Sequence, residues 1–101
     1  MLVEFSIVPL GAGTSVGSRV AEVLRLVDAS GLAYKVTPMG TVVEGAWEEV
    51  LRLIKRCHQI VLLQEERVLT TIRIDDRKGA KNMINTKVRS VEKKLGKVLK
   101  K

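Results

Sequence analysis

Residues 33–45 read Ala-Tyr-Lys-Val-Thr-Pro-Met-Gly-Thr-Val-Val-Glu-Gly. Two short extended segments, 33–37 and 41–44, flank the turn formers Pro38, Met39 and Gly40. With so short a connection, a tight antiparallel hairpin is the most economical structure for these two strands. Gly45 breaks the second strand, so the chain must leave the hairpin there.

On each side of the hairpin the chain has one predicted helix and one predicted strand. Apolar and polar residues alternate over 2–8 and 67–75, which predicts two further strands. Apolar residues recur at helical spacing over about 16–30 and 47–58, which predicts a helix between each outer strand and the hairpin. A third amphipathic helix is expected over about 80–100, with the apolar residues Ile84, Val88, Val91, Leu95 and Val98.

This order, βαββαβ with a final helix, favours an α+β fold. We expect a ferredoxin-like sandwich in which two helices cover one face of a four-stranded antiparallel sheet. With 101 residues and 46% hydrophobic residues, the chain should form a single domain over residues 1–101, with the basic C-terminal helix attached.

The second face of the sheet is expected to stay uncovered by the two crossover helices. Its predicted residues mix polar and apolar types: Glu4, Ser6, Val8, Leu69, Thr71 and Arg73, with Thr41 or Glu44 beside them. A face of this kind suits a ligand, a subunit partner or both. Glu4 and Asp75 are expected to partner Arg73 across neighbouring strands.

The net charge of +7 is unevenly distributed along the chain. Residues 77–101 hold ten basic residues and one acid, so this segment carries +9 and the remaining 76 residues carry −2. The basic helix is interpreted as a solvated face on a packing helix, with nucleic acid or an anionic membrane as alternatives. Nucleic acid is not expected, because the two central strands lack the stacking aromatics of an RNA-binding sheet.

Other features limit the possible chemistry and location. The single Cys57 excludes a disulfide scaffold, and no basic leader or membrane-length apolar run is seen, so we expect a cytoplasmic protein. The glycines at 11, 13 and 17 match neither a dinucleotide fingerprint nor a Walker loop, which favours a structural turn. Cys57 and His58 alone build neither a zinc site nor a catalytic triad. We therefore expect no enzyme, no metal and no cofactor.

Glu44, at the end of the hairpin, and Trp47, just after it, each have both a structural and a functional interpretation. Glu44 stands near a helix N-terminus, where the helix dipole favours a carboxylate. The same carboxylate could instead accept hydrogen bonds from a small nitrogen heterocycle. Trp47 begins the apolar stripe of the second helix and is expected to be a core anchor, with a pocket wall or subunit interface as alternatives.

Several segments together resemble a known family. They are Ser6 to Gly11, Gly31 to Tyr34, Thr37 to Gly45, Arg67 to Asp75 and Lys87 to Glu92, and the Pro-Met-Gly-Thr-Val-Val-Glu-Gly block is the most specific. In this order they resemble the small thiamine-binding proteins of archaea and bacteria. The resemblance implies a ferredoxin-like fold and a homo-oligomer, commonly a tetramer formed as a dimer of dimers partly through the sheets.

The resemblance also implies binding of thiamine or its hydroxymethylpyrimidine moiety without catalysis, as carrier, buffer or sensor. An aminopyrimidine edge could be matched by Glu44, Ser6 and Thr41, while Met39 or Trp47 contacts the ring face. The candidate ligand-binding residues are Ser6, Pro9, Gly11, Met39, Thr41, Glu44, Trp47 and Thr71. The alternative is a structural or interaction protein that assembles through its sheet face and binds no small ligand.

Overall fold

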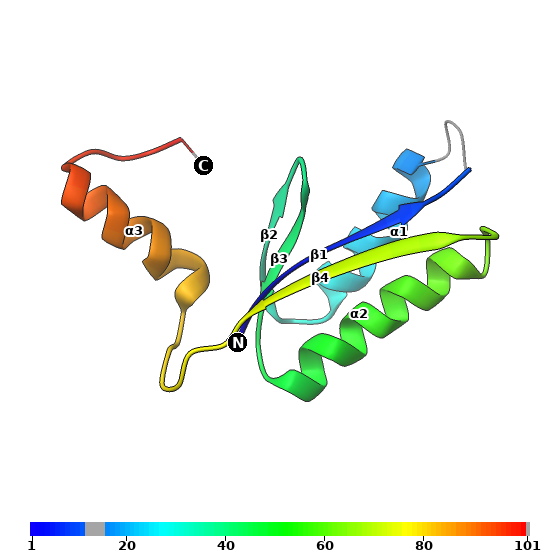
Figure 1. Cartoon of the computed structure of the whole chain (residues 1–101), viewed down its shortest axis with the longest axis horizontal. Helices are drawn as coiled ribbons and strands as arrows, with labels where there is room; N and C mark the ends of the chain where they lie inside the picture. Colours follow the sequence, from blue (N-terminus) through cyan, green and yellow to red (C-terminus); the bar gives the residue numbers. More distant parts are fainter. Residues whose placement is uncertain (12–15, 101) are drawn as a thin grey trace.

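Four strands form one antiparallel sheet in the computed structural model, which describes residues 1–11 and 16–100. They are β1 (Leu2–Pro9), β2 (Ala33–Thr37), β3 (Gly40–Glu44) and β4 (Val68–Asp75), in the spatial order β2-β3-β1-β4 (Figure 1). Each helical crossover, from β1 to β2 and from β3 to β4, passes over one strand before the chain rejoins the sheet, so β1 and β3 are central. This is the expected ferredoxin-like arrangement.

Two helices, α1 (Val16–Ala29) and α2 (Trp47–Leu62), cover one face of the sheet. The side chains of β1 and β3 that point towards them alternate with outward ones, as the sequence predicts. Together they form the apolar core: Val3, Phe5, Val23, Val27, Val43, Val50, Leu53, Ile54, Cys57 and Val61. Gly13, Thr14 and Ser15, which the sequence offered for the turn and helix cap before α1, lie outside the described residues.

The pairing register decides which side chains lie on the uncovered face. Glu4 pairs with Arg73, and their side chains form the expected ion pair at 3.5 Å. Thr41 pairs with Phe5, so it shares the helix-covered face and is buried, with 6% of its surface exposed. Its expected place on the open face was wrong, because the register of β3 against β1, not the hairpin sequence, fixes the side of each residue.

Trp47 differs from its expected place in the core. As the first residue of α2, it lies at the end of the sheet with 47% of its surface exposed, and its indole N–H donates to the Asp76 carboxylate at 3.2 Å. The apolar stripe of α2 enters the core only from Val50 onwards. The apolar stripe predicts which side of the helix faces the sheet, but it does not show whether the first turn of the helix lies over the sheet or beyond its end.

The third helix, α3 (Met83–Leu95), projects away from the sheet on the side opposite α1 and α2 (Figure 1). It gives the chain a Cα radius of gyration of 15.0 Å, against about 13 Å for a compact domain of this length. Of the expected apolar stripe, only Ile84 is buried; Val91 and Leu95 of α3 are exposed, as is Val98, which lies beyond the end of the helix. The expectation that the apolar stripe of this helix packs against the rest of the protein was therefore wrong within the single chain. No helix in the described part of the chain is long and apolar enough to span a membrane.

Candidate functional site

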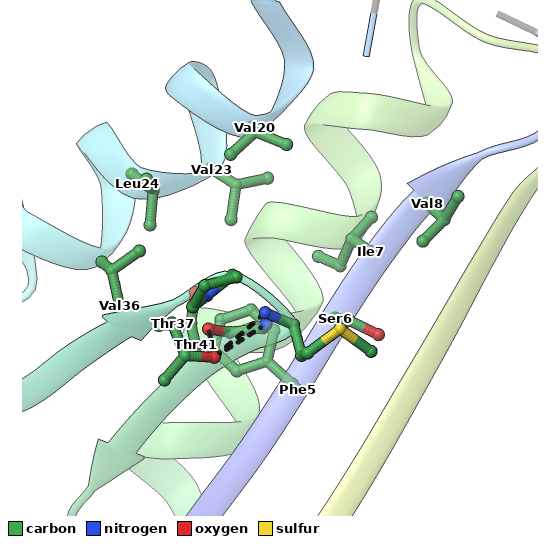
Figure 2. Close-up of a pocket in the computed structure, with 13 residues that line it drawn as sticks. Phe5, Ser6, Ile7, Val8, Val20, Val23, Leu24, Val36, Thr37 and Thr41 are labelled. Atoms are coloured by element: carbon green, nitrogen blue, oxygen red, sulfur yellow. Dashed lines mark hydrogen bonds between the residues drawn. The ribbon is translucent and has the colours of Figure 1, made fainter. Parts of the chain in front are cut away.

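A cavity of about 180 Å³ lies between α1, the second half of β1 and the β2–β3 hairpin (Figure 2). We call it the hairpin pocket. Its wall is formed by Phe5, Ser6, Ile7, Val8, Val20, Val23, Leu24, Val36, Thr37, Pro38, Met39, Gly40 and Thr41. Three of the residues that the sequence proposed for a ligand, Ser6, Met39 and Thr41, are thus brought together here.

The turn of the hairpin is held rigid beside the pocket. The Thr37 hydroxyl accepts hydrogen bonds from the N–H groups of Met39 (3.2 Å) and Gly40 (3.1 Å) and donates to the Gly40 carbonyl (2.9 Å). A Cβ on Gly40 would lie 2.9 Å from the Phe5 carbonyl oxygen, so only glycine allows β3 to approach β1 this closely. The exposed Met39 side chain is carried at the tip of this fixed turn.

The hairpin pocket is apolar and uncharged. None of its lining residues has an ionisable side chain, and the hydroxyl-bearing residues among them are Ser6, Thr37 and Thr41. The side chains of Val23 and Leu24 project from α1 towards the hairpin (Figure 2). The sequence assigned α1 to the core and gave no signal that its first turns also line a cavity.

Glu44 lies outside the hairpin pocket and forms the N-terminal cap of α3. Its carboxylate accepts hydrogen bonds from the backbone N–H groups of Met83 (2.9 Å) and Ile84 (3.2 Å). The residue at the N-cap position of α3, Asn82, has φ 54° and makes no side-chain cap bond, so Glu44 supplies the missing acceptor. The carboxylate does stand at a helix N-terminus, but at that of α3 and not of α2.

A second cavity, of about 190 Å³, surrounds this cap and is charged. We call it the α3-anchor cavity; it is lined by Met1, Leu2, Glu44, Asp75, Arg77, Ala80, Met83 and Lys87. The Lys87 ammonium lies 2.7 Å from the Asp75 carboxylate and, by its hydrogen bond and charge, lowers the pKa of that carboxyl. Asp75 was expected to pair with Arg73 and is paired with Lys87 instead, because α3 returns to the end of β4.

The other proposed ligand residues are spread over the molecule. Pro9 is buried at the end of β1, and Gly11 follows it with φ 81°, which fits a structural turn. Trp47 lies at the start of α2, and Thr71 is on the open face opposite Ser6. None of these four lines the hairpin pocket. Their part in ligand binding stays a prediction.

Cys57 and His58 take structural places: Cys57 is fully buried within the core, not at its edge, and His58 is partly buried beside it. Burial raises the pKa of the Cys57 thiol to about 11, so the thiol is protonated and unreactive at neutral pH. The His58 ring nitrogen Nδ1 lies 2.6 Å from the Thr70 hydroxyl, which fastens α2 to β4. The described residues contain no group of three or more His, Cys, Asp or Glu side chains placed to hold a metal ion.

Comparison with known proteins gives these cavities a family context. Residues 3–92 match the model of a family described as thiamine-binding protein. The chain belongs to this family. The matched region includes nearly all of β1, the hairpin, both core helices, β4 and most of α3. It therefore contains every residue that lines the hairpin pocket, and all those of the α3-anchor cavity except Met1 and Leu2.

Relatives occur in bacteria and archaea. A UPF0045 protein of Mycobacterium bovis is 40% identical over 96 residues, covering 94% of each chain. The crystal structure of a Methanocaldococcus jannaschii protein is 36% identical and superposes with a TM-score of 0.82, covering 89% of this chain and 93% of that one. A Thermotoga maritima structure, 23% identical with a TM-score of 0.79, covers 89% of this chain and 96% of its own and supports the fold alone.

Proposed function

We propose that the protein binds thiamine or its hydroxymethylpyrimidine moiety in the hairpin pocket, without catalysis, as a carrier, buffer or sensor in the cytoplasm. One observation carries this proposal: a member of the thiamine-binding family has an uncharged apolar cavity at the most specific family segment, Pro38 to Gly45. The absence of ionisable side chains from its lining favours binding over acid–base chemistry.

The size of the pocket favours one ring of the ligand. An apolar cavity of about 150 Å³ binds benzene, whereas sites that enclose drug-sized ligands are about 300–1,000 Å³. At about 180 Å³, the hairpin pocket matches a single six-membered ring. Thiamine has two rings joined by a methylene group, so one ring would be enclosed and the other would lie at the mouth.

The charge of the pocket favours the pyrimidine ring as the enclosed one. The thiazolium ring carries a permanent positive charge, and burying a charge without a partner is costly. The aminopyrimidine is neutral and needs only hydrogen-bond partners, which the Thr41 hydroxyl and backbone groups of the hairpin can provide. Hydroxymethylpyrimidine alone is therefore expected to retain most of the affinity of thiamine.

Calorimetric titration with thiamine and with hydroxymethylpyrimidine tests this proposal. Val20→Trp, which fills the pocket from the partly exposed α1 side, should abolish binding. Thr41→Val keeps the side-chain shape and should weaken binding about two- to tenfold, the value of one neutral hydrogen bond. Thr86→Val, at an exposed position of α3 that lines neither cavity, is the matched control and should bind normally.

Glu44→Gln separates the hairpin pocket from the α3-anchor cavity. Unchanged affinity supports the hairpin pocket, whereas a large loss, with Thr41→Val unaffected, would move the ligand to the charged cavity around Glu44. If neither ligand gives heat with the folded protein, the binding function is refuted. The remaining interpretation is then the structural one, in which the chain only assembles.

We also propose that the protein works as a homo-oligomer, a dimer of dimers. This proposal is supported by the open sheet face and by the exposed apolar residues Val91 and Leu95 of α3, which the chain itself leaves uncovered. The +9 segment and the −2 body would also attract each other between copies. Light scattering should give about four times the 11.2 kDa chain mass, and Leu95→Asp should lower it.

A further inference from the structure

A polar cluster joins the beginning of α1 to the chain that follows α2. Arg19, in the first turn of α1, donates from Nε to the Glu65 carboxylate at 2.9 Å and from Nη1 to the side-chain oxygen of Gln64 at 2.7 Å. The same Nη1 lies 2.9 Å from the carboxylate of Glu22, further along α1. The Gln64 side-chain N–H donates to Glu22 at 2.5 Å and closes the ring of contacts. We call these four residues the Arg19 cluster.

The Arg19 cluster is a partly buried link. The side chains of Arg19 and Glu65 are only 19% and 14% exposed, and charges in such places are screened less by salt than fully exposed ones. The hydrogen bond with Glu65 raises the pKa of the Arg19 guanidinium above its ordinary value, so the residue stays charged. A guanidinium suits this position because its N–H donors, fixed in one plane, reach several acceptors at once.

The acceptors of the cluster stand on a fixed support. The backbone N–H groups of Gln64 and Glu65 both donate to the Val61 carbonyl, at 3.0 and 3.1 Å. Val61 is fully buried in the core. The Arg19 cluster therefore ties α1 to a segment that the core itself holds in place.

The part of α1 held in this way also forms one wall of the hairpin pocket. Val20 follows Arg19 directly, and Val23 and Leu24 lie one turn further on; all three line the pocket (Figure 2). Val20 is 43% exposed. Among the α1 side chains that the structure describes, from Gly17 onwards, Val23 is the first buried one. The first turn of α1 is thus tied to α2 by polar bonds before the apolar packing of the helix begins.

The opposite wall of the pocket is fixed by the backbone. The Thr37 hydroxyl holds the hairpin turn, and Gly40 lets β3 lie close against β1. The width of the pocket therefore depends on where the first turns of α1 stand.

We propose that Arg19 is a positioning residue for ligand binding, which holds the Val20 wall at the distance from the hairpin that encloses one ring. This inference rests on the proposed function of the hairpin pocket. Without the Arg19 cluster, the first turns of α1 would adopt several positions, and only a fraction of the molecules would have a pocket of the right width. The apparent Kd rises by the inverse of that fraction, so a competent fraction of about one tenth weakens binding about tenfold.

Calorimetric titration with hydroxymethylpyrimidine and with thiamine tests the positioning role. Arg19→Gln should bind both ligands about tenfold more weakly than the wild type. Arg19→Lys keeps the charge but lacks the planar set of donors, so its affinity should lie between those of the wild type and of Arg19→Gln. The matched control is Arg25→Gln, which removes a positive charge from an exposed position of the same helix outside the pocket lining and should bind normally.

The comparison of the two ligands separates positioning from a direct effect of charge. Hydroxymethylpyrimidine is neutral, whereas the thiazolium ring of thiamine is positively charged. Removing a nearby positive charge would by itself strengthen binding of thiamine and leave that of hydroxymethylpyrimidine unchanged. Positioning instead predicts the same loss for both ligands.

Hydrogen exchange measured by mass spectrometry locates the change. In Arg19→Gln without ligand, peptides from the first half of α1 should exchange faster than in the wild type, while those from β1 and the middle of α2 keep their rates. Saturating hydroxymethylpyrimidine should restore slow exchange in α1. If all peptides accelerate together, Arg19 supports the whole fold and the positioning role is overturned.

The outcomes also distinguish this inference from the proposed function. If the wild type binds and Arg19→Gln binds equally well, the positioning role is overturned and the binding function stands. If the wild type binds neither ligand, the binding function is refuted and the positioning role falls with it. If Arg19→Gln does not fold, Arg19→Lys decides: equal loss of affinity for both ligands supports the positioning role, and wild-type affinity overturns it.

Discussion

Removing the Glu44 carboxylate should release α3 while leaving the body of the protein folded. In Glu44→Ala, the N–H groups of Met83 and Ile84 lose their acceptor, and the N-terminal end of the helix dipole loses its negative partner. Loss of a capping side chain costs about 0.5–2 kcal/mol. The other contacts that hold α3 include the burial of Ile84 and the exposed pair of Lys87 with Asp75, which by itself is worth about 0–1 kcal/mol.

Hydrogen exchange measured by mass spectrometry detects this change locally. A loss of about 1–2 kcal/mol should speed exchange of the α3 amides roughly 5- to 30-fold. Peptides from β1 and α2 should keep their wild-type rates. In Glu44→Gln, which keeps one acceptor oxygen without the charge, the α3 amides should exchange at a rate between those of the wild type and of Glu44→Ala.

The matched control is Glu48→Ala, an exposed acid in the first turn of α2. It should leave exchange in α3 unchanged. If α3 in Glu44→Ala exchanges at the wild-type rate, the Glu44 cap does not hold the helix. If all peptides accelerate together, Glu44 supports the whole fold and not α3 alone.

Two further predictions concern the hairpin and the α3 anchor. Gly40→Ala should lower the free energy of unfolding, measured in urea, by about 1–3 kcal/mol, because its Cβ would lie 2.9 Å from the Phe5 carbonyl oxygen of β1. The control Gly17→Ala, whose Cβ would meet no atom within 4 Å, should be neutral or stabilising. Equal effects of the two substitutions would contradict the close approach of β3 to β1. The lowered pKa of Asp75 means that its pair with Lys87 is complete above about pH 4 and is lost as the pH falls through that lowered pKa. NMR titration of the Asp75 carboxyl should show its pKa rising in Lys87→Met but not in Lys81→Met.

β1, β3 and the two core helices were predictable because each has one buried face. In β1, Val3 and Phe5 alternate with Glu4 and Ser6, and a period of two identifies a half-buried strand without further information. The hairpin followed from its turn residues. Such local signals are strong wherever the same residues also form the core.

The positions that the sequence placed wrongly depend on contacts between distant segments. The face of Thr41 depends on the register of β3 against β1, and the partner of Glu44 lies 39 residues further along the chain. The position of Trp47 depends on where α2 passes the end of the sheet. The hairpin pocket also depends on contacts between distant segments, because it forms where α1 lies beside the hairpin turn. The periodicity of the sequence predicts each element but not the space left between two of them.

Strand β3 does two separate tasks within five residues. Thr41 at its start faces the helix-covered side and lines the hairpin pocket, while Glu44 near its end faces the other side and holds α3. Because the two positions are an odd number of residues apart, a deletion or insertion of one residue between them would turn one of the two side chains to the wrong side. The length of this strand is therefore constrained as tightly as its composition, and natural or engineered variants should tolerate substitutions in β3 far better than changes in its length.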